Sequence, residues 1–221
     1  MRSVIFDLDG TLADTSGDLV AAANACFRDM GLGDLLDAQA DAATALRGGR
    51  AMLTLGLTRI NHPERGALVD RYYPFLLEAY GAALSEHTRL YPGAIETVEG
   101  LRRAGYAVGI CTNKPEGLAE QLMRALGVRD AFASLVGADT LPVRKPDPAP
   151  VWEAVRRAGG DASRACLVGD TVTDRKAAEN AGIASILVTF GPGQEDVRAL
   201  NPEGLIGHFD ELPGVVRQLI G

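Results

Sequence analysis

The 221-residue sequence has few of the features that mark secreted, membrane or disulfide-stabilised proteins. It has three cysteines, Cys26, Cys111 and Cys166, an odd number at wide spacing, which favours small buried side chains over a disulfide framework or a thiolate metal site. No window approaches the ~18 consecutive apolar residues of a membrane span, and the first residues lack a basic segment followed by an apolar run. These absences predict a cytoplasmic protein with no membrane partner.

Basic clusters are also missing. The formal net charge is -7, the isoelectric point is about 5.0, and lysines and arginines are not interleaved with aromatic residues. A nucleic-acid partner is therefore disfavoured. Hydrophobic residues make up 47% of the chain, enough to fill the core of one large domain or two small ones. The sequence is compatible with a monomer or a homodimer.

Short apolar runs alternate with longer amphipathic patterns, which predicts an α/β fold, a three-layer doubly wound parallel sheet. The predicted strands are 3–8, 107–112, 134–137, 165–169 and 184–189. The predicted helices are 93–104, 116–126, 148–159, 173–181 and 210–220. Segment 16–88 has helical patterns but no convincing strand, so it is predicted to be a helical insertion after the first strand. The α/β core domain then comprises 1–15 and 89–221.

The first apolar run, Val4-Ile5-Phe6, leads directly into the acidic turn Asp7-Leu8-Asp9-Gly10-Thr11. Side chains alternate along an extended chain, so Asp7 and Asp9 are predicted to leave a buried strand on the same side and to share one small site. Adjacent carboxylates favour a bound cation or one protonated carboxyl, and both states are useful in phosphate chemistry. The alternative is that Asp9 or Asp14 caps the following helix.

Polar residues also flank the other predicted strands, where a parallel sheet forms its ligand site. They are Thr112-Asn113-Lys114, Lys145-Pro146, Gly169-Asp170 and Asp174. A threonine hydroxyl can hold phosphoryl oxygens, a lysine can neutralise a phosphate or a carboxylate, and an aspartate can hold Mg²⁺. Each has a structural alternative: a turn at 112–113, a solvated Lys145, and an N-cap of helix 173–181 by Asp170 or Asp174.

The ordered set of these motifs resembles the haloacid dehalogenase superfamily of phosphohydrolases over nearly the whole chain. Asp7-Leu8-Asp9-Gly10-Thr11-Leu12 is similar to its first motif, Thr112-Asn113 to the second, Lys145-Pro146 to the third, and 169–174 to the fourth. The resemblance implies a Rossmann-like core with a helical cap inserted after the first strand. Within the superfamily, the length, the cap type and Leu90-Tyr91-Pro92-Gly93 are most similar to phosphoglycolate phosphatases.

The resemblance also implies a mechanism. Asp7 would attack phosphorus to form an aspartyl-phosphate, and Asp9, oriented by Thr11, would protonate the leaving group and then activate water. Mg²⁺ would be held by Asp7, the Asp9 carbonyl and Asp170, with Asp174 in a supporting or water-mediated position. The residues expected to steady the phosphoryl oxygens are Thr112, Asn113 and Lys145.

Substrate specificity is expected to come from the cap, because the core motifs touch only the phosphoryl group. Segment 46–51 contains Gly48-Gly49, which can open a helix, and two cations for a small carboxylate. Arg50 is the first candidate to bind that carboxylate and Arg47 the second; Lys114 is a third cation within reach. The substrate-binding prediction therefore comprises Thr11, Arg47, Gly49, Arg50 and Lys114. The alternative is an ordinary helix–helix connection with solvated arginines.

The most favoured function is Mg²⁺-dependent hydrolysis of 2-phosphoglycolate, a small-molecule phosphomonoester. The alternatives are another small phosphoester, such as a sugar phosphate, pyridoxal phosphate or pyrophosphate, and then a sugar phosphomutase that uses the same carboxylate pair. A catalytically silent binding module is least favoured because all four motifs are intact.

Overall fold

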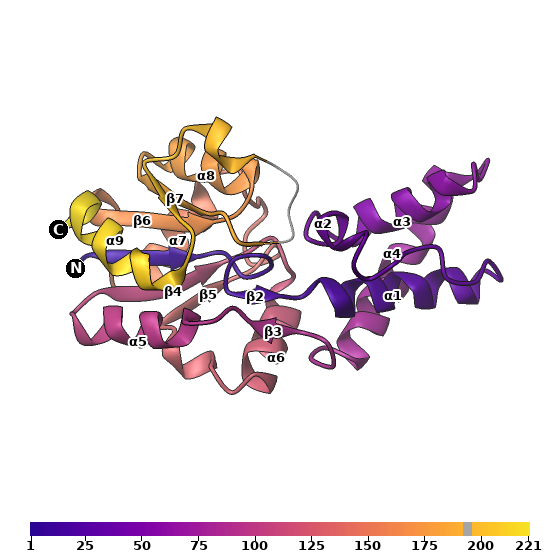
Figure 1. Cartoon of the computed structure of the whole chain (residues 1–221), viewed down its shortest axis with the longest axis horizontal. Helices are drawn as coiled ribbons and strands as arrows, with labels where there is room; N and C mark the ends of the chain where they lie inside the picture. Colours follow the sequence, from indigo (N-terminus) through magenta and orange to yellow (C-terminus); the bar gives the residue numbers. More distant parts are fainter. Residues whose placement is uncertain (192–195) are drawn as a thin grey trace. The chain divides into compact units, whose positions relative to one another are not determined.

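The structure is a computed structural model that describes residues 1–191 and 196–221 (Figure 1). The described chain groups into two compact units, each treated separately below. One contains Met1–Ala13, Leu90–Gly191 and residues 196–221, and the other contains Asp14–Arg89. Across the described ranges, no helix is both long enough and apolar enough to cross a membrane.

The first unit is built on a six-stranded parallel sheet. Its strands are β1 (Ser3–Phe6), β4 (Ala107–Cys111), β5 (Ser134–Val136), β6 (Ala165–Gly169), β7 (Ala184–Val188) and β8 (Gly204–Ile206). They lie in the order β5-β4-β1-β6-β7-β8, with every neighbouring pair parallel. The chain builds outward in both directions from β1, so the strand order reverses there. This reversal places the ends of β1, β4 and β6 together at one edge.

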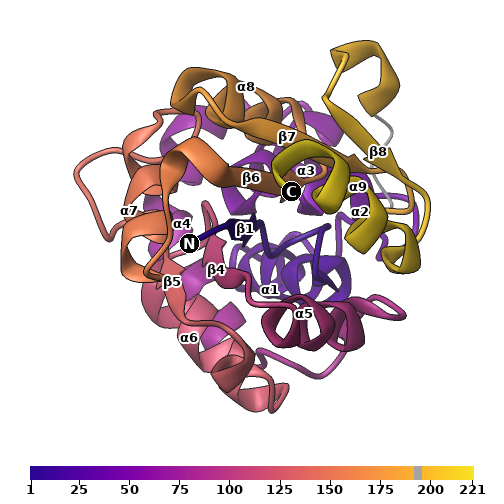
Figure 2. The same cartoon turned by 90° about the vertical axis from the view of Figure 1, so that its left-hand side faces the viewer.

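Helices cover both faces of this sheet. They are α5 (Ala94–Arg103), α6 (Glu116–Ala125), α7 (Ala149–Arg157), α8 (Val172–Ala181) and α9 (Leu212–Ile220), with short 3₁₀ turns η1 (Arg129–Ala131), η2 (Ala162–Arg164), η3 (Val197–Leu200) and η4 (Phe209–Glu211). Figure 2 shows α7 and α8 on one face and α5 and α9 on the other. Ile5, Leu167 and Val151 belong to the buried cluster beneath α7 and α8. The predicted three-layer α/β fold is confirmed.

The second unit is helical. Its helices are α1 (Ser16–Asp29), α2 (Ala42–Ala45), α3 (Gly49–Arg59) and α4 (Arg65–Ala82). Where the chain enters and leaves it, β2 (Ala13–Asp14) pairs with β3 (Arg89–Leu90). Helices α1 and α3 approach closely because residue 56 is glycine: a Cβ there would lie 2.4 Å from Phe27 Cζ. Segment 16–88 is thus helical, as its sequence patterns predict.

A buried carboxylate ties the two ends of the helical unit together. Asp18, only 2% exposed, lies in the first turn of α1. It accepts hydrogen bonds from the His87 and Thr88 backbone N–H groups at 2.8 and 2.9 Å, and from Thr88 Oγ1 at 2.6 Å. A carboxylate supplies enough lone pairs for all three donors, so the start of α1 is joined to the segment that leads into β3.

Replacing Asp18 with asparagine should destabilise the helical unit. An amide has one acceptor oxygen, so at least one of the three buried donors loses a charge-assisted bond, at a cost of about 2–4 kcal/mol. Thermal unfolding should show a melting temperature lower by roughly 5–10 °C. Asp34→Asn is the matched control, because Asp34 forms an exposed ion pair with Arg28 whose loss should cost less than about 1 kcal/mol. Equal melting of the two variants would contradict this role for Asp18.

Candidate active site

Three aspartates meet at the ligand edge of the parallel sheet. Asp7 follows β1, Asp170 follows β6, and Asp174 lies in the first turn of α8. One carboxylate oxygen from each lies within 4.8 Å of the others. The Asp7 N–H donates to the Val168 carbonyl at 2.8 Å, which continues the β1–β6 pairing and fixes the Asp7 backbone.

A buried lysine neutralises part of this acidic cluster. Lys145 is 3% exposed, and its Nζ lies 3.0 Å from Asp7 Oδ1 and 2.6 Å from Asp174 Oδ1. The alternative of a solvated Lys145 is therefore wrong. Three carboxylates facing one ammonium leave an excess of negative charge when all are ionised, and such an excess must be balanced by protons or by a cation.

Asp174 has a structural task as well as a place in the cluster. Thr171 is the N-cap of α8, and it forms a capping box with Asp174 in which Asp174 Oδ2 accepts from the Thr171 N–H at 3.1 Å and from its hydroxyl at 2.6 Å. The close approach depends on Gly169, where a Cβ would lie 2.4 Å from the Asp174 Cβ. The alternative that Asp170 or Asp174 is the N-cap of this helix is wrong, because Thr171 holds that position; Asp174 lies at the third helical residue and also pairs with Lys145.

Thr11 supports a different carboxylate from the predicted one. Its hydroxyl donates to Asp170 Oδ1 at 2.8 Å, whereas we predicted that it orients Asp9. The side chain is fully buried, so the structure assigns Thr11 to the support of Asp170 rather than to a substrate contact. The cause is the reversal at Gly10 (φ +83°), after which the Thr11 N–H donates back to Leu8.

Asp9 is turned toward a second lysine. Lys114 Nζ lies 2.8 Å from Asp9 Oδ1, and the two side chains are only 4% and 16% exposed. Asp7 and Asp9 therefore face different ammonium groups. Strand geometry stops before Asp9, which bridges to Ala13 within the turn, so the period-two alternation no longer applies.

The second motif is anchored to the third. Asn113 Nδ2 donates to the Lys145 carbonyl at 2.9 Å, and Thr112 Oγ1 accepts from the Lys114 N–H at 3.1 Å. Sequence reasoning found both residues but gave Asn113 a phosphoryl contact. In the structure its amide holds the loop that carries Lys145.

Burial changes the acidity of the cluster. Desolvation raises the pKa of Asp7 to about 7; Lys145 opposes this, and Asp174 and Asp9 add to it. Desolvation, with Asp174 and Asp7, also raises the pKa of Asp170 well above its usual range. Burial alone would lower the pKa of Lys145, but Asp174 and Asp7 outweigh it and the net shift is upward. Lys145 therefore stays charged, while the carboxyls compete for protons.

These shifts predict how stability depends on pH. Because the folded-state pKa of Asp7 is raised from 3.8 to about 7, its contribution to stability is fully present below pH 3.8 and is lost as the pH rises through about 7. With a chelator present, the protein should melt several degrees higher at pH 6 than at pH 8. Asp7→Asn should reduce this difference. A variant with the same pH dependence as the wild type would contradict the assignment.

The cluster has the donors that a hard divalent cation prefers. All of its ligand atoms are carboxylate oxygens. Asp7 Oδ1 is buried and pairs with the Lys145 ammonium at 3.0 Å, but in the part of the chain that the structure describes it accepts no hydrogen bond. An acceptor in that position fits either a metal ion or a reacting phosphorus atom. The residues therefore fit a cation such as Mg²⁺, held by Asp7, Asp170 and Asp174.

The predicted cap residues lie at the start of α3, within the helical unit. Helix α3 begins at Gly49, as the Gly48-Gly49 pair predicts, and a Cβ at Gly49 would lie 2.6 Å from Leu76 Cδ2. Arg50 Nη1 binds Asp70 at 2.6 Å and its guanidinium lies 4.6 Å from the Tyr73 ring centre. Arg47 is exposed, and within residues 1–191 and 196–221 its side chain has no ion pair.

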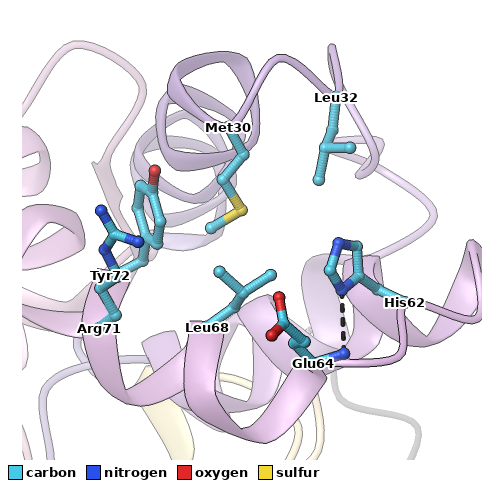
Figure 3. Close-up of a pocket in the computed structure, with 7 residues that line it drawn as sticks. All are labelled: Met30, Leu32, His62, Glu64, Leu68, Arg71 and Tyr72. Atoms are coloured by element: carbon cyan, nitrogen blue, oxygen red, sulfur yellow. Dashed lines mark hydrogen bonds between the residues drawn. The ribbon is translucent and has the colours of Figure 1, made fainter.

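A separate hollow of about 170 Å³ lies wholly within the helical unit (Figure 3). His62, Glu64, Arg71 and Tyr72 line it together with three apolar side chains. His62 Nδ1 accepts from the Glu64 N–H at 3.2 Å, the contact drawn in Figure 3. None of the predicted site residues lines this hollow.

The three cysteines are all buried and unpaired, as predicted. Burial raises the pKa of Cys166 to about 12 and, despite Lys145, raises that of Cys111 to about 12. Neither thiol is therefore a nucleophile near neutral pH.

Comparisons with known proteins agree with the fold and the motifs. The model of the haloacid dehalogenase-like hydrolases matches residues 4–188. The phosphoglycolate phosphatase of Mesorhizobium japonicum is 39% identical over 209 residues, covering 95% of this chain and 92% of its own. That of Agrobacterium fabrum is 38% identical over 221 residues, covering 98% and 93%. The crystal structure of a predicted phosphoglycolate phosphatase from Haemophilus somnus 129PT superposes with a TM-score of 0.83 at 25% identity, covering 97% of both chains.

Proposed function

The chain belongs to the haloacid dehalogenase-like hydrolase family and is a phosphatase, and from this premise we propose that it hydrolyses 2-phosphoglycolate to glycolate and phosphate. The assignment of the substrate rests on the similarity to phosphoglycolate phosphatases along almost the entire chain. The proposed residue roles rest on the geometry of the acidic cluster.

Asp7 is the proposed nucleophile. Its Oδ1 is buried, lacks a hydrogen bond among the described residues and lies 3.0 Å from the Lys145 ammonium. One Asp7 oxygen forms a bond to phosphorus while the ester P–O bond breaks, and the carboxylate charge moves onto an aspartyl-phosphate. Lys145 holds the attacking carboxylate in place and balances charge as the phosphoryl group transfers.

Asp9 is the proposed acid and base. In the first displacement its carboxyl proton goes to the departing alkoxide oxygen. In the second, it takes a proton from the water whose oxygen attacks phosphorus, and the Asp7–phosphorus bond breaks. The Thr112 hydroxyl is the proposed phosphoryl contact from the second motif.

Mg²⁺ is the proposed cofactor. Asp7, Asp170 and Asp174 would hold it, together with the Asp9 carbonyl that sequence resemblance adds. When bound, the ion supplies positive charge to the phosphoryl oxygens. Asp170 is held ready by the Thr11 hydroxyl, and Asp174 by the capping box of α8.

For the substrate carboxylate we propose Arg47 ahead of Arg50, which reverses the order taken from the sequence. Arg50 already binds Asp70 and lies over Tyr73, so recruiting it would break an existing ion pair. Arg47 carries no such cost. Its role as a specificity residue of the helical unit is supported by its charge and exposure.

The test is Mg²⁺-dependent phosphate release from 2-phosphoglycolate, a sugar phosphate, pyridoxal phosphate and pyrophosphate. A preference in kcat/KM for 2-phosphoglycolate is expected. Arg47→Ala should raise KM for this substrate about tenfold, a loss of ~1.4 kcal/mol, and leave ethyl phosphate unaffected. Arg71→Ala is the control, because Arg71, like Arg47, is an exposed arginine of the helical unit.

Broad turnover without preference would keep the phosphatase activity and reject the named substrate. Formation of an isomerised sugar phosphate in place of free phosphate would instead favour the phosphomutase alternative.

A further inference from the structure

We propose that Lys114 is a positioning residue for Asp9, and that it acts on proton transfer rather than on substrate binding. This inference rests on the proposed function, in which Asp9 moves the protons. Its basis is the ion pair between Lys114 Nζ and Asp9 Oδ1 at 2.8 Å, formed by two largely buried side chains. Sequence reasoning had assigned the same ammonium to the substrate.

The fold holds the Lys114 backbone on both sides. Its N–H donates to Thr112 Oγ1 at 3.1 Å, and its carbonyl accepts from the Ala138 N–H, beyond β5, at 2.9 Å. The Thr112 N–H in turn donates to the Val136 carbonyl at 2.9 Å. The ends of β4 and β5 thus fix the backbone position from which the Lys114 side chain extends.

The Asp9 backbone is also held in place. Its backbone bridges to Ala13 across the turn, and the Gly10 N–H donates to the Ala13 carbonyl at 2.9 Å. With the backbone fixed, the remaining freedom of the carboxyl group is rotation about its side-chain bonds. The Lys114 contact on Oδ1 limits that rotation and so sets where the proton-transferring oxygens lie. A proton donor must be within about 3.2 Å of the atom it serves, so a loosened carboxyl would lose rate.

A substrate role for this ammonium is less favourable. The Lys114 side chain is 4% exposed and its charge is balanced by Asp9, so binding a substrate carboxylate would place a second anion beside Asp9. The two roles make different kinetic predictions. Loss of positioning lowers kcat wherever a proton must move, whereas loss of a substrate contact raises KM only for substrates that carry a carboxylate.

The leaving group provides the test. Ethyl phosphate and 2-phosphoglycolate expel an alkoxide that needs a proton, whereas p-nitrophenyl phosphate expels a stable phenolate that does not. In Lys114→Gln, kcat for both alkyl esters should fall about 100-fold, with KM changed less than twofold. With p-nitrophenyl phosphate, formation of the aspartyl-phosphate should stay fast, because the phenolate needs no proton. Hydrolysis of the aspartyl-phosphate should slow, because Asp9 must take a proton from the attacking water. Stopped-flow absorbance should then show a burst of about one nitrophenolate per enzyme, larger than in the wild type.

Two controls make the result decisive. Lys114→Arg keeps a cation and should retain kcat within about tenfold of the wild type, and thermal unfolding checks that each variant is folded. Equal losses on all three esters without a burst would mean a merely structural role, and a rise in KM confined to 2-phosphoglycolate would mean a substrate contact. Either result overturns the proposal for Lys114. Wild-type protein that released phosphate from none of these esters would instead overturn the proposed function.

Discussion

Asp7→Asn is expected to lower phosphate release by about 10⁴-fold or more while leaving the protein folded. The amide has nearly the shape of the carboxylate but lacks its charge and nucleophilicity, so no aspartyl-phosphate forms. The structure adds a second expectation. Because burial and the neighbouring aspartates raise the pKa of Asp7 to about 7, the ionised group is costly to bury, and its removal should keep or raise the melting temperature at pH 8 in the absence of metal.

Loss of activity without loss of stability separates a chemical role from a structural one. Asp161→Asn is the matched control: the same change is made at an exposed residue of the same unit, where Asp161 Oδ1 accepts from the Ser163 N–H at 2.9 Å. It should leave kcat unchanged. If Asp7→Asn retained more than a few per cent of the wild-type kcat, Asp7 could not be the nucleophile, and an attack by water directly on the ester would have to be considered.

Much of the core was predictable because its strands are buried on both faces and read as apolar runs. Leu167 and Ile5, for example, lie in such runs and are fully buried. The last strand, β8, was missed for the converse reason: it has three residues, begins with glycine and exposes Leu205 to solvent at the sheet edge. Short edge strands carry little hydrophobic signal.

The membership of the acidic cluster was also predictable, since parallel strands bring the residues that follow them to one edge. The pairing of each lysine ammonium with a particular carboxylate was not predictable from the sequence. Lys145 belongs to the third motif and Lys114 follows the second, and their separate pairing with Asp7 and Asp9 depends on the chain reversal at Gly10. Pairings of this kind are set by turn geometry and side-chain rotamers, which residue spacing does not encode.

Lys145→Met is expected to be the most destabilising of the substitutions considered. The side chain is 2% exposed and touches both Asp7 and Asp174, so its removal leaves the buried carboxylates without their ammonium partner. Breaking a buried ion pair from one side costs about 3–5 kcal/mol, which corresponds to a melting temperature lower by roughly 10 °C or more at pH 8 with a chelator present. Activity should fall as well, because Asp7 loses the cation that holds it.

The cause of that destabilisation can be identified by supplying the missing charge in other forms. Protons should restore part of the stability, so the deficit should shrink between pH 8 and pH 6, and Mg²⁺ should raise the melting temperature of the variant more than that of the wild type. Lys176→Met, an exposed change on α8, should show neither effect. If Lys145→Met melted low but responded to neither protons nor Mg²⁺, lost packing of the lysine stem would explain the result, and electrostatic repulsion within the cluster would not.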